Sequence, residues 1–374
     1  MKKIKVMTIL GTRPEIIRLS MVMKKLDKYV DHVIVHTNQN YDYELNKVFF
    51  DDLNLRKPNH ILDVKGNLIG ELIGNILSQC EKVLIEEKPD AVLILGDTNS
   101  ALSCIIAKRM KIPIFHMEAG NRCFDERVPE EINRRIVDHT SDINLCYSEH
   151  ARRNLLREGL APQNIFVTGS PLKEVYNHFW DKIEESDILD RMKLEKKKYL
   201  VASIHREENL DNPENFRLIL EALNELVSKY KMPIIFSTHP RTRKKLKEYN
   251  FELDPRIKFM KPFGMFDYIK LQKNALCNLS DSGTIHEDAA IMRIPAVNVR
   301  ESTERPEVYD TGNTIMTGMN KDIIVQSVST VISQFEDKIY FKAPYNYEDE
   351  ICSDKIVRLI IGLSSIIRKK NYFI

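Results

Sequence analysis

Short apolar runs alternate with longer amphipathic stretches along almost the whole chain, and this alternation constrains the fold more than any other feature. Near-continuous apolar runs are typical of parallel strands that are covered by helices on both faces. The segments between them carry apolar residues three or four positions apart and predict those helices. The strands expected in the first part of the chain are 4–10, 32–36, 91–96, 113–117, 142–147 and 164–169, and the helices are 14–28, 67–88, 99–110, 129–140 and 148–158.

The pattern begins again after residue 170, which predicts a second domain. A helix is expected after Pro213, with Asp211 as its N-cap. Two successive series of alternating strands and helices imply two doubly wound α/β domains, and 374 residues suffice for both. We place the boundary at residue 170, and the terminal helix near 352–369 is too apolar for a free tail. The strands expected in the second domain are 198–205, 233–239, 257–260, 275–280 and 295–300.

Net charge, hydropathy and cysteine usage argue against a nucleic-acid-binding, membrane-spanning or disulfide-rich protein. The formal net charge is +2, so there is no global basic field that would favour nucleic acid. No apolar run approaches the length needed to span a membrane. The six cysteines lie in apparent core segments without CxxC spacing, which indicates reduced thiols in a cytoplasmic protein and neither a zinc site nor a disulfide framework.

The first strand runs directly into Gly11-Thr12-Arg13-Pro14-Glu15 and then a helix. A glycine turn at a helix N-terminus favours an anion, because backbone N–H groups and the helix dipole point at it, and Arg13 adds a guanidinium suited to phosphate. Neither GxGxxG nor GxxxxGK[ST] occurs, so dinucleotide binding is not supported. The alternative is a tight turn beside a solvated surface arginine.

Carboxylates follow two further strands of the first domain. Asp97 comes directly after 91–96, and Glu118 follows 113–117. The carboxyl ends of parallel strands share one edge of a sheet, where ligands of open α/β sheets bind. The segment PEEINRR (129–135) then opens a helix, where acidic residues such as Glu131 are also expected on dipole grounds alone.

The second domain carries basic and small residues at the corresponding edge. His205-Arg206 and His239 end two strands, which suggests a surface that faces an anion. Small residues after 275–280 let backbone N–H groups approach a phosphate, and carboxylates in the next turn could bond ribose hydroxyls. Helix N-terminal electrostatics would also explain those carboxylates. The residues concerned are Ser282, Gly283, Thr284, Glu287 and Asp288, and Arg305 follows them beside a proline.

Eight motifs in order resemble the non-hydrolysing UDP-N-acetylglucosamine 2-epimerase family. They extend from about residue 6 to residue 307 and cover both domains. The resemblance implies a GT-B architecture, with two Rossmann-like domains, a cleft between them and a terminal helix that crosses back. Residues 1–170 with 352–374 would then form one domain and 171–351 the other. The motifs are GTRPE, GDT, HMEAG, PEEINR, HREEN, STHPR, DSGT and STERPE.

Within that family the chain looks closest to UDP-N-acetyl-L-fucosamine synthases, which act on UDP-2-acetamido-2,6-dideoxy-L-talose. The pointers are HTNQNYDY (36–43), GNRCFDERVPEEINR (120–134) and STERPE (302–307). Glucosamine-type enzymes more often have GLRTGD where this chain has GNRCFD, a second glycine at Thr284, and a histidine at Asn40 associated with allosteric binding of substrate.

The resemblance implies elimination of UDP across carbons 1 and 2 to a 2-acetamidoglycal, followed by re-addition with the proton delivered to the other face. Asp97, Glu118 and Glu130 would be the acid/base groups, and His205 would assist departure of UDP. No metal or nicotinamide is required, and a homodimer without nucleic-acid or membrane partners is expected. The implied UDP-sugar ligands are Arg13, Arg18, Arg206, His239, Ser282, Gly283, Thr284, Glu287, Asp288 and Arg305.

Alternatives remain open from the residues. A glucosamine-type 2-epimerase would share all the motifs but use UDP-N-acetylglucosamine. A GT-B glycosyltransferase would share the fold and the UDP site but need an acceptor. A hydrolysing epimerase would release free sugar, and a UDP-sugar sensor would only bind. Each of these predicts a different fate for a UDP-sugar incubated with the protein alone.

Overall fold

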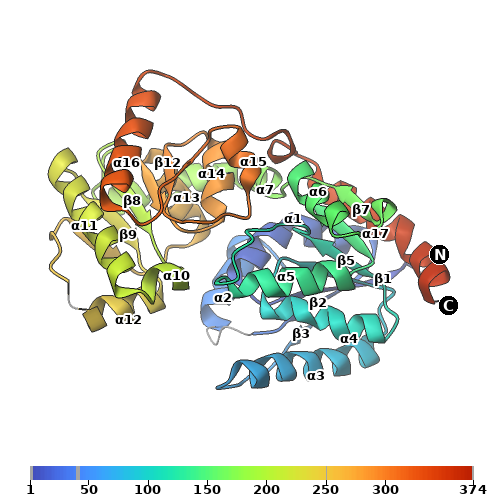
Figure 1. The fold of residues 1–374 in the computed structure, drawn as a ribbon. Coiled ribbons are helices and arrows are strands. Elements are labelled where there is room, and N and C mark those ends of the chain that lie inside the picture. The colour runs from blue at the N-terminus through green and yellow to red at the C-terminus, as the bar shows by residue number, and fades with distance from the viewer. Residues whose placement is uncertain (1–2, 39–42, 250, 373–374) are drawn as a thin grey trace. The chain divides into compact units, whose positions relative to one another are not determined.

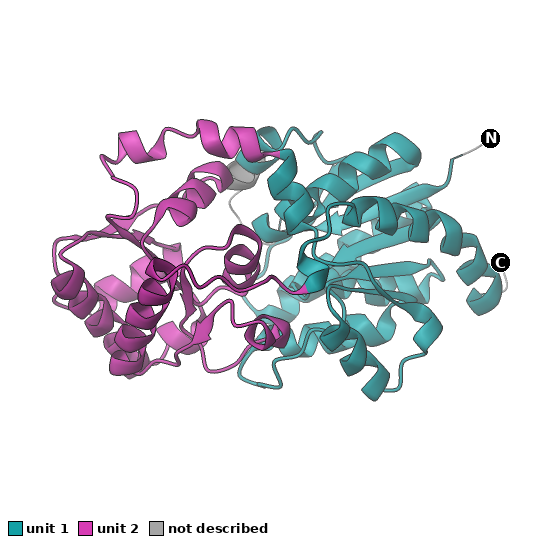
Figure 2. Ribbon diagram, turned by 90° about the horizontal axis from the view of Figure 1, so that it is seen from above, with its two compact units in different colours: residues 1–178, 345–374 teal, residues 179–344 magenta. Residues whose placement is uncertain are grey.

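The chain folds into two compact units, described here from a computed structural model that covers residues 3–38, 43–249 and 251–372 (Figure 2). Unit 1 comprises Met1–His178 and Tyr345–Ile374, and unit 2 comprises Phe179–Pro344. Gln39 and Asn40, and with them the position of the allosteric histidine, lie outside the described residues. Among the described residues, no helix has the length and apolar character that crossing a membrane demands.

The crossings between the units lie at 178 and 345, whereas the sequence pattern suggests a boundary at 170 and the family resemblance implies a return at 352. Helix α7 (Leu172–His178) packs on α1 and so belongs to unit 1. Its Glu174 accepts a hydrogen bond from the Ser353 backbone at 2.8 Å, and the Ser170 backbone N–H donates to Asn346 at 3.0 Å. These contacts join residues 171–178 and 345–351 to unit 1.

Unit 1 is built on a parallel sheet in the order β3-β2-β1-β4-β5-β6-β7 (Figure 1). Each strand expected in this part of the chain is present. Strand β3 was not expected, because two residues are too few to show a periodic pattern. The strands are β1 (Lys5–Leu10), β2 (Asp31–His36), β3 (His60–Ile61), β4 (Ala91–Leu95), β5 (Ile114–Met117), β6 (Ile143–Cys146) and β7 (Ile165–Val167).

Helices cover both faces of this sheet, which is why most residues of its strands are apolar. On one face, α3, α4 and α5 bury side chains such as Ile76, Leu84 and Val137 against β1, β2, β4 and β5. On the other, α1 packs against α2, α7 and α17. The elements are α1 (Arg13–Tyr29), α2 (Tyr43–Asp52), α3 (Ile69–Glu87), η1 (Asn99–Ser103), α4 (Cys104–Arg109), α5 (Pro129–Thr140), α6 (Glu149–Arg157), η2 (Pro162–Asn164), η3 (Tyr345–Tyr347), α17 (Cys352–Ile367) and the π-helical η4 (Arg368–Tyr372).

Unit 2 repeats the plan with a parallel sheet in the order β10-β9-β8-β11-β12-β13. Side chains alternate along β8, where Leu200 and Ala202 face α11 and α16 while Tyr199 and Val201 face α9 and α13. Two parallel-sheet, Rossmann-like units confirm the expected GT-B class. The strands are β8 (Leu200–Ser203), β9 (Ile234–Ser237), β10 (Ile257–Met260), β11 (Asn278–Ser280), β12 (Ala296–Asn298) and β13 (Ile315–Met316).

The helix predicted after Pro213 is present as α11, but Asn212 is its N-cap instead of Asp211. The Asn212 carboxamide oxygen accepts from the Glu214 and Asn215 N–H groups at 3.0 and 3.4 Å. The helices of unit 2 are α8 (Trp180–Glu185), α9 (Ile188–Arg191), α10 (Glu207–Leu210), α11 (Pro213–Tyr230), α12 (Pro240–Tyr249), α13 (Met265–Asn274), α14 (Thr284–Met292), α15 (Pro306–Asp310) and α16 (Lys321–Glu336).

Candidate active site

The order in which strands are added to the parallel sheet of unit 1 reverses between β1 and β4, which are hydrogen-bonded neighbours. Ligands of open α/β sheets bind beyond the carboxyl ends of the strands at such a switch point. The turn after β1 contains Arg13, and the segments after β4 and β5 contain Asp97 and Glu118. The topology therefore brings three predicted site segments to one edge.

Asp97 is held by α5. Arg134 binds one Asp97 carboxylate oxygen through Nε at 3.0 Å and Nη2 at 2.6 Å. The Asn133 side chain donates to the Asp97 carbonyl at 2.9 Å. Arg134 is buried, while the Asp97 side chain is 25% exposed. Helix α5 thus fixes the orientation of the Asp97 carboxylate, while part of that carboxylate remains accessible to solvent.

Glu118 and Arg18, both predicted site residues, lie together. Arg18 Nη1 is 3.4 Å from Glu118 Oε2, and both side chains are mostly buried. Glu118 also has a φ of 66°, in the left-handed region that side chains other than glycine rarely adopt. Such strain costs on the order of 1–3 kcal/mol and concentrates at functional positions. The strained turn sets the direction of the Glu118 carboxylate at the strand end.

The two glutamates at the start of α5 have different surroundings. Glu131 is fully buried and accepts hydrogen bonds from the Cys123 and Phe124 N–H groups at 3.1 and 3.3 Å. Burial alone would raise its pKa, but Arg134 and these N–H groups hold the pKa below its usual value. Glu131 therefore pins the loop after β5, whereas Glu130 lies half-buried in the first helical turn.

A buried ion network supports the turns that carry Asp97 and Glu118. Asp138 accepts from Gly120 N and Arg122 Nη1 and lies 2.9 Å from His116 Nδ1. Burial opposes its ionisation, yet His116 and Arg122 keep the pKa of Asp138 below its usual value. His116 Nε2 lies 2.9 Å from the Gly96 carbonyl. A β-carbon at Gly120 would overlap the Ala151 carbonyl, so the close packing there requires glycine.

Glu15 links the turn after β1 to the loop after β4. Its Oε2 accepts from the Gly11 N–H at 3.1 Å and the Thr12 hydroxyl at 2.7 Å. Its Oε1 accepts from the Thr98 hydroxyl at 3.2 Å. Only 2% of the residue is exposed, and burial raises the pKa of Glu15 to about 7 against the opposing effect of these hydrogen bonds.

In unit 2 the order of strand addition reverses between the parallel neighbours β8 and β11, and predicted residues lie there too. The buried Asp281 carboxylate accepts from the His205 and Arg206 N–H groups at 2.9 and 2.8 Å and lies 3.1 Å from His205 Nδ1. The His205 ring is about one-third exposed, and its centroid is 6.0 Å from that of the exposed His239. Asp281 thus orients His205 at the carboxyl edge.

The turn from β11 into α14 is tightly built around Gly283. The Ser282 hydroxyl accepts from the Thr284 N–H at 3.2 Å. A β-carbon on Gly283 would overlap the carboxylate of Glu304, which binds Arg300 Nη1 at 2.9 Å. Gly283 therefore packs directly against Glu304, and only a residue without a side chain fits at this N-terminus of α14, where backbone N–H groups favour a phosphate.

The other predicted UDP ligands of unit 2 lie deeper. Arg305 Nη2 is 3.2 Å from Glu287 Oε2, and both side chains are almost fully buried. Asp288 accepts from the Gln272 side chain at 3.1 Å. Glu287 and Asp288 are therefore fixed by protein contacts at the start of α14. The predicted residues form two groups, one at the carboxyl edge of each sheet.

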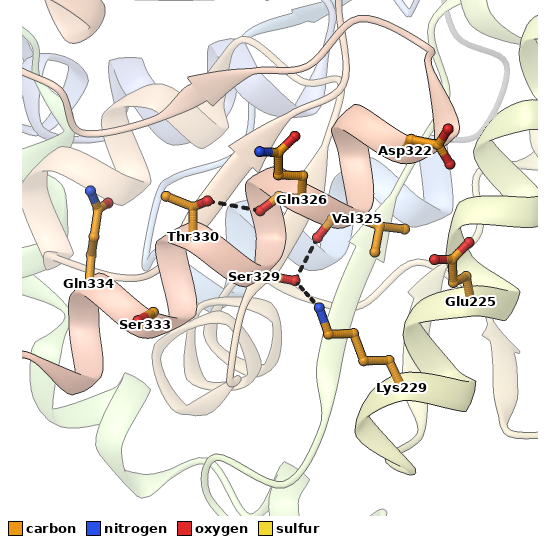
Figure 3. Close-up of a pocket in the computed structure, with 9 residues that line it drawn as sticks. All are labelled: Glu225, Lys229, Asp322, Val325, Gln326, Ser329, Thr330, Ser333 and Gln334. Carbon is orange, nitrogen blue, oxygen red and sulfur yellow. Dashed lines mark hydrogen bonds between the residues drawn. The ribbon is translucent and has the colours of Figure 1, made fainter.

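A separate surface hollow of about 600 Å³ lies between α11 and α16 in unit 2 (Figure 3). Its polar lining includes Lys229, which donates to Ser329 at 2.6 Å. The hollow contains no predicted site residue. All of its lining residues belong to α11 and α16, so we do not assign the chemistry to it.

Several residues that build the site were not singled out as site residues from the sequence. Glu15 stands inside the GTRPE motif, and Arg134 stands inside PEEINR, so their motifs were the available signal. His116 and Glu304 likewise stand inside HMEAG and STERPE, whereas Asp138 lies in none of the motifs, and all three act through buried contacts that spacing does not reveal. Each supports a neighbouring predicted residue.

Comparison with known proteins identifies close relatives along the full chain. Residues 24–361 match the sequence profile of the family described as UDP-N-acetylglucosamine 2-epimerase. The UDP-N-acetylglucosamine 2-epimerase of Methanocaldococcus jannaschii is 38% identical over 95% of this chain and 98% of its own. A Pseudomonas aeruginosa UDP-2,3-diacetamido-2,3-dideoxy-D-glucuronate 2-epimerase is 33% identical over 88% of this chain and 93% of its own.

Solved structures of proteins from the same family resemble this chain over nearly its full length. A UDP-N-acetylglucosamine 2-epimerase from Rickettsia bellii is 47% identical with a TM-score of 0.93, covering 100% of both chains. The M. jannaschii enzyme in complex with UDP-GlcNAc and UDP is 37% identical with a TM-score of 0.90, covering 96% of this chain and 100% of its own. A spinosyn rhamnosyltransferase, 11% identical with a TM-score of 0.51, shares the fold alone.

Proposed function

Because this chain belongs to the UDP-N-acetylglucosamine 2-epimerase family, we propose that it inverts carbon 2 of a UDP-N-acetylhexosamine without a cofactor, by elimination and re-addition of UDP. The observation that carries this proposal is the strained Glu118, paired with Arg18 at the same sheet edge as Asp97. Proton transfer at carbon requires such positioned carboxylates.

The elimination step balances without water or an oxidant. A carboxylate takes the proton from carbon 2, the carbon 1–oxygen bond to UDP breaks, and a carbon 1–carbon 2 double bond forms. Addition of UDP to carbon 1 and return of a proton to the opposite face of carbon 2 completes the inversion. Two faces need two acid/base groups, and we assign these roles among Asp97, Glu118 and Glu130.

Departure of UDP develops negative charge on the diphosphate. We assign its stabilisation to Arg13 in unit 1 and, in unit 2, to His205 and the N-terminus of α14 at Ser282, Gly283 and Thr284. The fixed ring of His205 and the glycine at α14 support this assignment. Arg206, His239, Asp288 and the Arg305–Glu287 pair complete the proposed UDP site.

For the sugar, we propose UDP-2-acetamido-2,6-dideoxy-L-talose, giving UDP-N-acetyl-L-fucosamine for surface polysaccharide synthesis. The segments 120–134 and 302–307 support this choice by their resemblance to L-fucosamine synthases. UDP-N-acetylglucosamine is the second candidate, because the M. jannaschii relative carries that name and was solved with UDP-GlcNAc.

The test is NMR of each UDP-sugar with the protein in deuterated buffer. Deuterium at carbon 2 with inverted configuration is the expected result, and the faster of the two sugars identifies the branch. Binding without exchange would contradict epimerisation and favour a sensor or a glycosyltransferase. Free sugar plus UDP would indicate a hydrolysing enzyme.

We also propose that the protein is a homodimer. Apolar side chains are exposed on α3, on its N-cap residue and on α5, and both helices contact η1 on the same side of the unit 1 sheet. A second copy would cover them. Light scattering of the wild type and of Ile132→Glu tests this, and a wild-type monomer would contradict it. The exposed residues are Leu68, Ile69, Ile85, Ile132 and Ile136.

A further inference from the structure

We propose that Glu15 is a positioning residue, which fixes the turn carrying Arg13 relative to the loop carrying Asp97 through its hydrogen bond with Thr98. This inference rests on the proposed function, because it assigns how that same site is held in its working geometry. Glu15 itself is not placed in contact with the substrate, since the residue is almost fully buried.

The geometry of the Glu15 carboxylate supports a link between two strand ends. One oxygen is used by Gly11 and Thr12 in the turn after β1. The other oxygen reaches Thr98, 83 residues later in the chain and next to Asp97. The two strands are joined by backbone pairing from Val6–Ala91 to Ile9–Ile94. Beyond the last paired residues, the Glu15 carboxylate joins the turn that contains Arg13 to the loop that contains Asp97.

The cost of this arrangement argues for a functional reason. A carboxyl group so deeply buried ionises less readily than in water, and no lysine or arginine is hydrogen-bonded to it in the contacts described here. An apolar side chain would fill the same interior space without this penalty. What such a side chain could not do is accept hydrogen bonds from both segments at once.

Thr98 offers a matched set of variants, because valine has the same shape without the hydroxyl and serine keeps the hydroxyl. Thr98→Val should lower kcat for carbon 2 deuterium exchange about tenfold, while KM and UDP affinity stay within about twofold. Thr98→Ser should recover most of the wild-type kcat. Thr8→Val is the control, because Thr8 also loses a buried hydrogen bond, to His32 at 2.9 Å, but lies in the middle of β1.

Variants of Glu15 test the same link from its other end. Glu15→Gln should keep kcat within about threefold, because the amide can accept from the turn and donate to Thr98. Glu15→Met should lower kcat as Thr98→Val does, and the double variant should be no slower than Glu15→Met alone. If Glu15→Met does not fold, the comparison of Thr98→Val with Thr98→Ser still tests whether Glu15 positions the two segments.

Three results would overturn the inference: normal kcat in Thr98→Val, equal losses in Thr98→Ser and Thr98→Val, or a parallel loss of kcat and UDP affinity. Absence of carbon 2 exchange in the wild-type protein would instead overturn the proposed function. The two failures are therefore distinguishable in one series of measurements.

Discussion

Arg134 holds Asp97 through two nitrogens of one guanidinium, Nε at 3.0 Å and Nη2 at 2.6 Å from the same carboxylate oxygen. Its third nitrogen, Nη1, binds Glu131 at 2.7 Å. Because Glu131 in turn accepts hydrogen bonds from Cys123 and Phe124, α5 connects the loop after β4 with the loop after β5. Arg134 thus orients Asp97, although the family resemblance did not identify Arg134 as a site residue.

Replacing Arg134 by lysine should lower kcat about tenfold to a hundredfold, because an ammonium group cannot reproduce the fork that holds Asp97. Steady-state kinetics with the better UDP-sugar would measure this. Arg217→Lys in α11 is the control, since Arg217 is 41% exposed and pairs with Glu214 and Glu221 on the surface of that helix. Similar losses in both variants would contradict a special role for the Arg134 fork.

Glu118→Gln should abolish turnover while UDP affinity stays within about threefold, because an amide cannot take the proton from carbon 2. Deuterium exchange reports the chemistry, and calorimetric titration with UDP reports binding. Glu126→Gln, an exposed glutamate in the same segment of unit 1, serves as the control. Near-normal exchange by Glu118→Gln would refute its assigned role.

Gly283→Ala should weaken UDP binding at least tenfold, because the added methyl group overlaps the Glu304 carboxylate and displaces the turn into α14. Gly74→Ala in α3 is the control, since its β-carbon meets nothing within 4 Å. Titration of both variants with UDP makes the comparison. Wild-type affinity in Gly283→Ala would show that this turn does not approach the nucleotide.

Because the pKa of Glu15 is raised by burial, we expect the folded protein to lose stability as the pH rises. This pKa rises from 4.5 to about 7 on folding, so the contribution of Glu15 is fully present below pH 4.5 and is lost as the pH passes through 7. At about 1.4 kcal/mol per pKa unit, the change approaches roughly 3 kcal/mol by pH 8. Denaturant unfolding of the wild type and Glu15→Gln at pH 5 and pH 8 should show the variant gaining relative stability. An unchanged difference would contradict the burial-driven shift.

The strand pattern predicted the fold well because buried parallel strands are almost uniformly apolar. It also predicted that Asp97 and Glu118 share an edge, since the carboxyl ends of parallel strands must do so. The pattern could not show that Arg18 lies beside Glu118, because that contact depends on how α1 packs. Nor could it locate β3 and β13, whose pairing with a neighbouring strand defines them more than their two residues do.

The residues that support the site through buried contacts were the hardest to predict from the sequence. Glu131 and Glu130 are adjacent and chemically identical, yet one is a buried anchor of the loop and the other is half-buried. His116 stands in an apolar strand, and only the folded chain places it between Gly96 and Asp138. Local sequence encodes which groups reach the sheet edge, while tertiary packing decides which of them are held in place.

The return of the chain to unit 1 at residue 345 has a consequence for biosynthesis. Unit 2 is continuous in sequence, whereas unit 1 needs α17, whose Ile356 and Ile360 are buried in the completed protein. During translation, unit 2 can therefore finish folding before unit 1, although unit 1 emerges first. A chain truncated after residue 344 should show a protease-resistant unit 2 beside a protease-sensitive unit 1. Synthesis of the last thirty residues then acts as the final assembly step of the first-made unit.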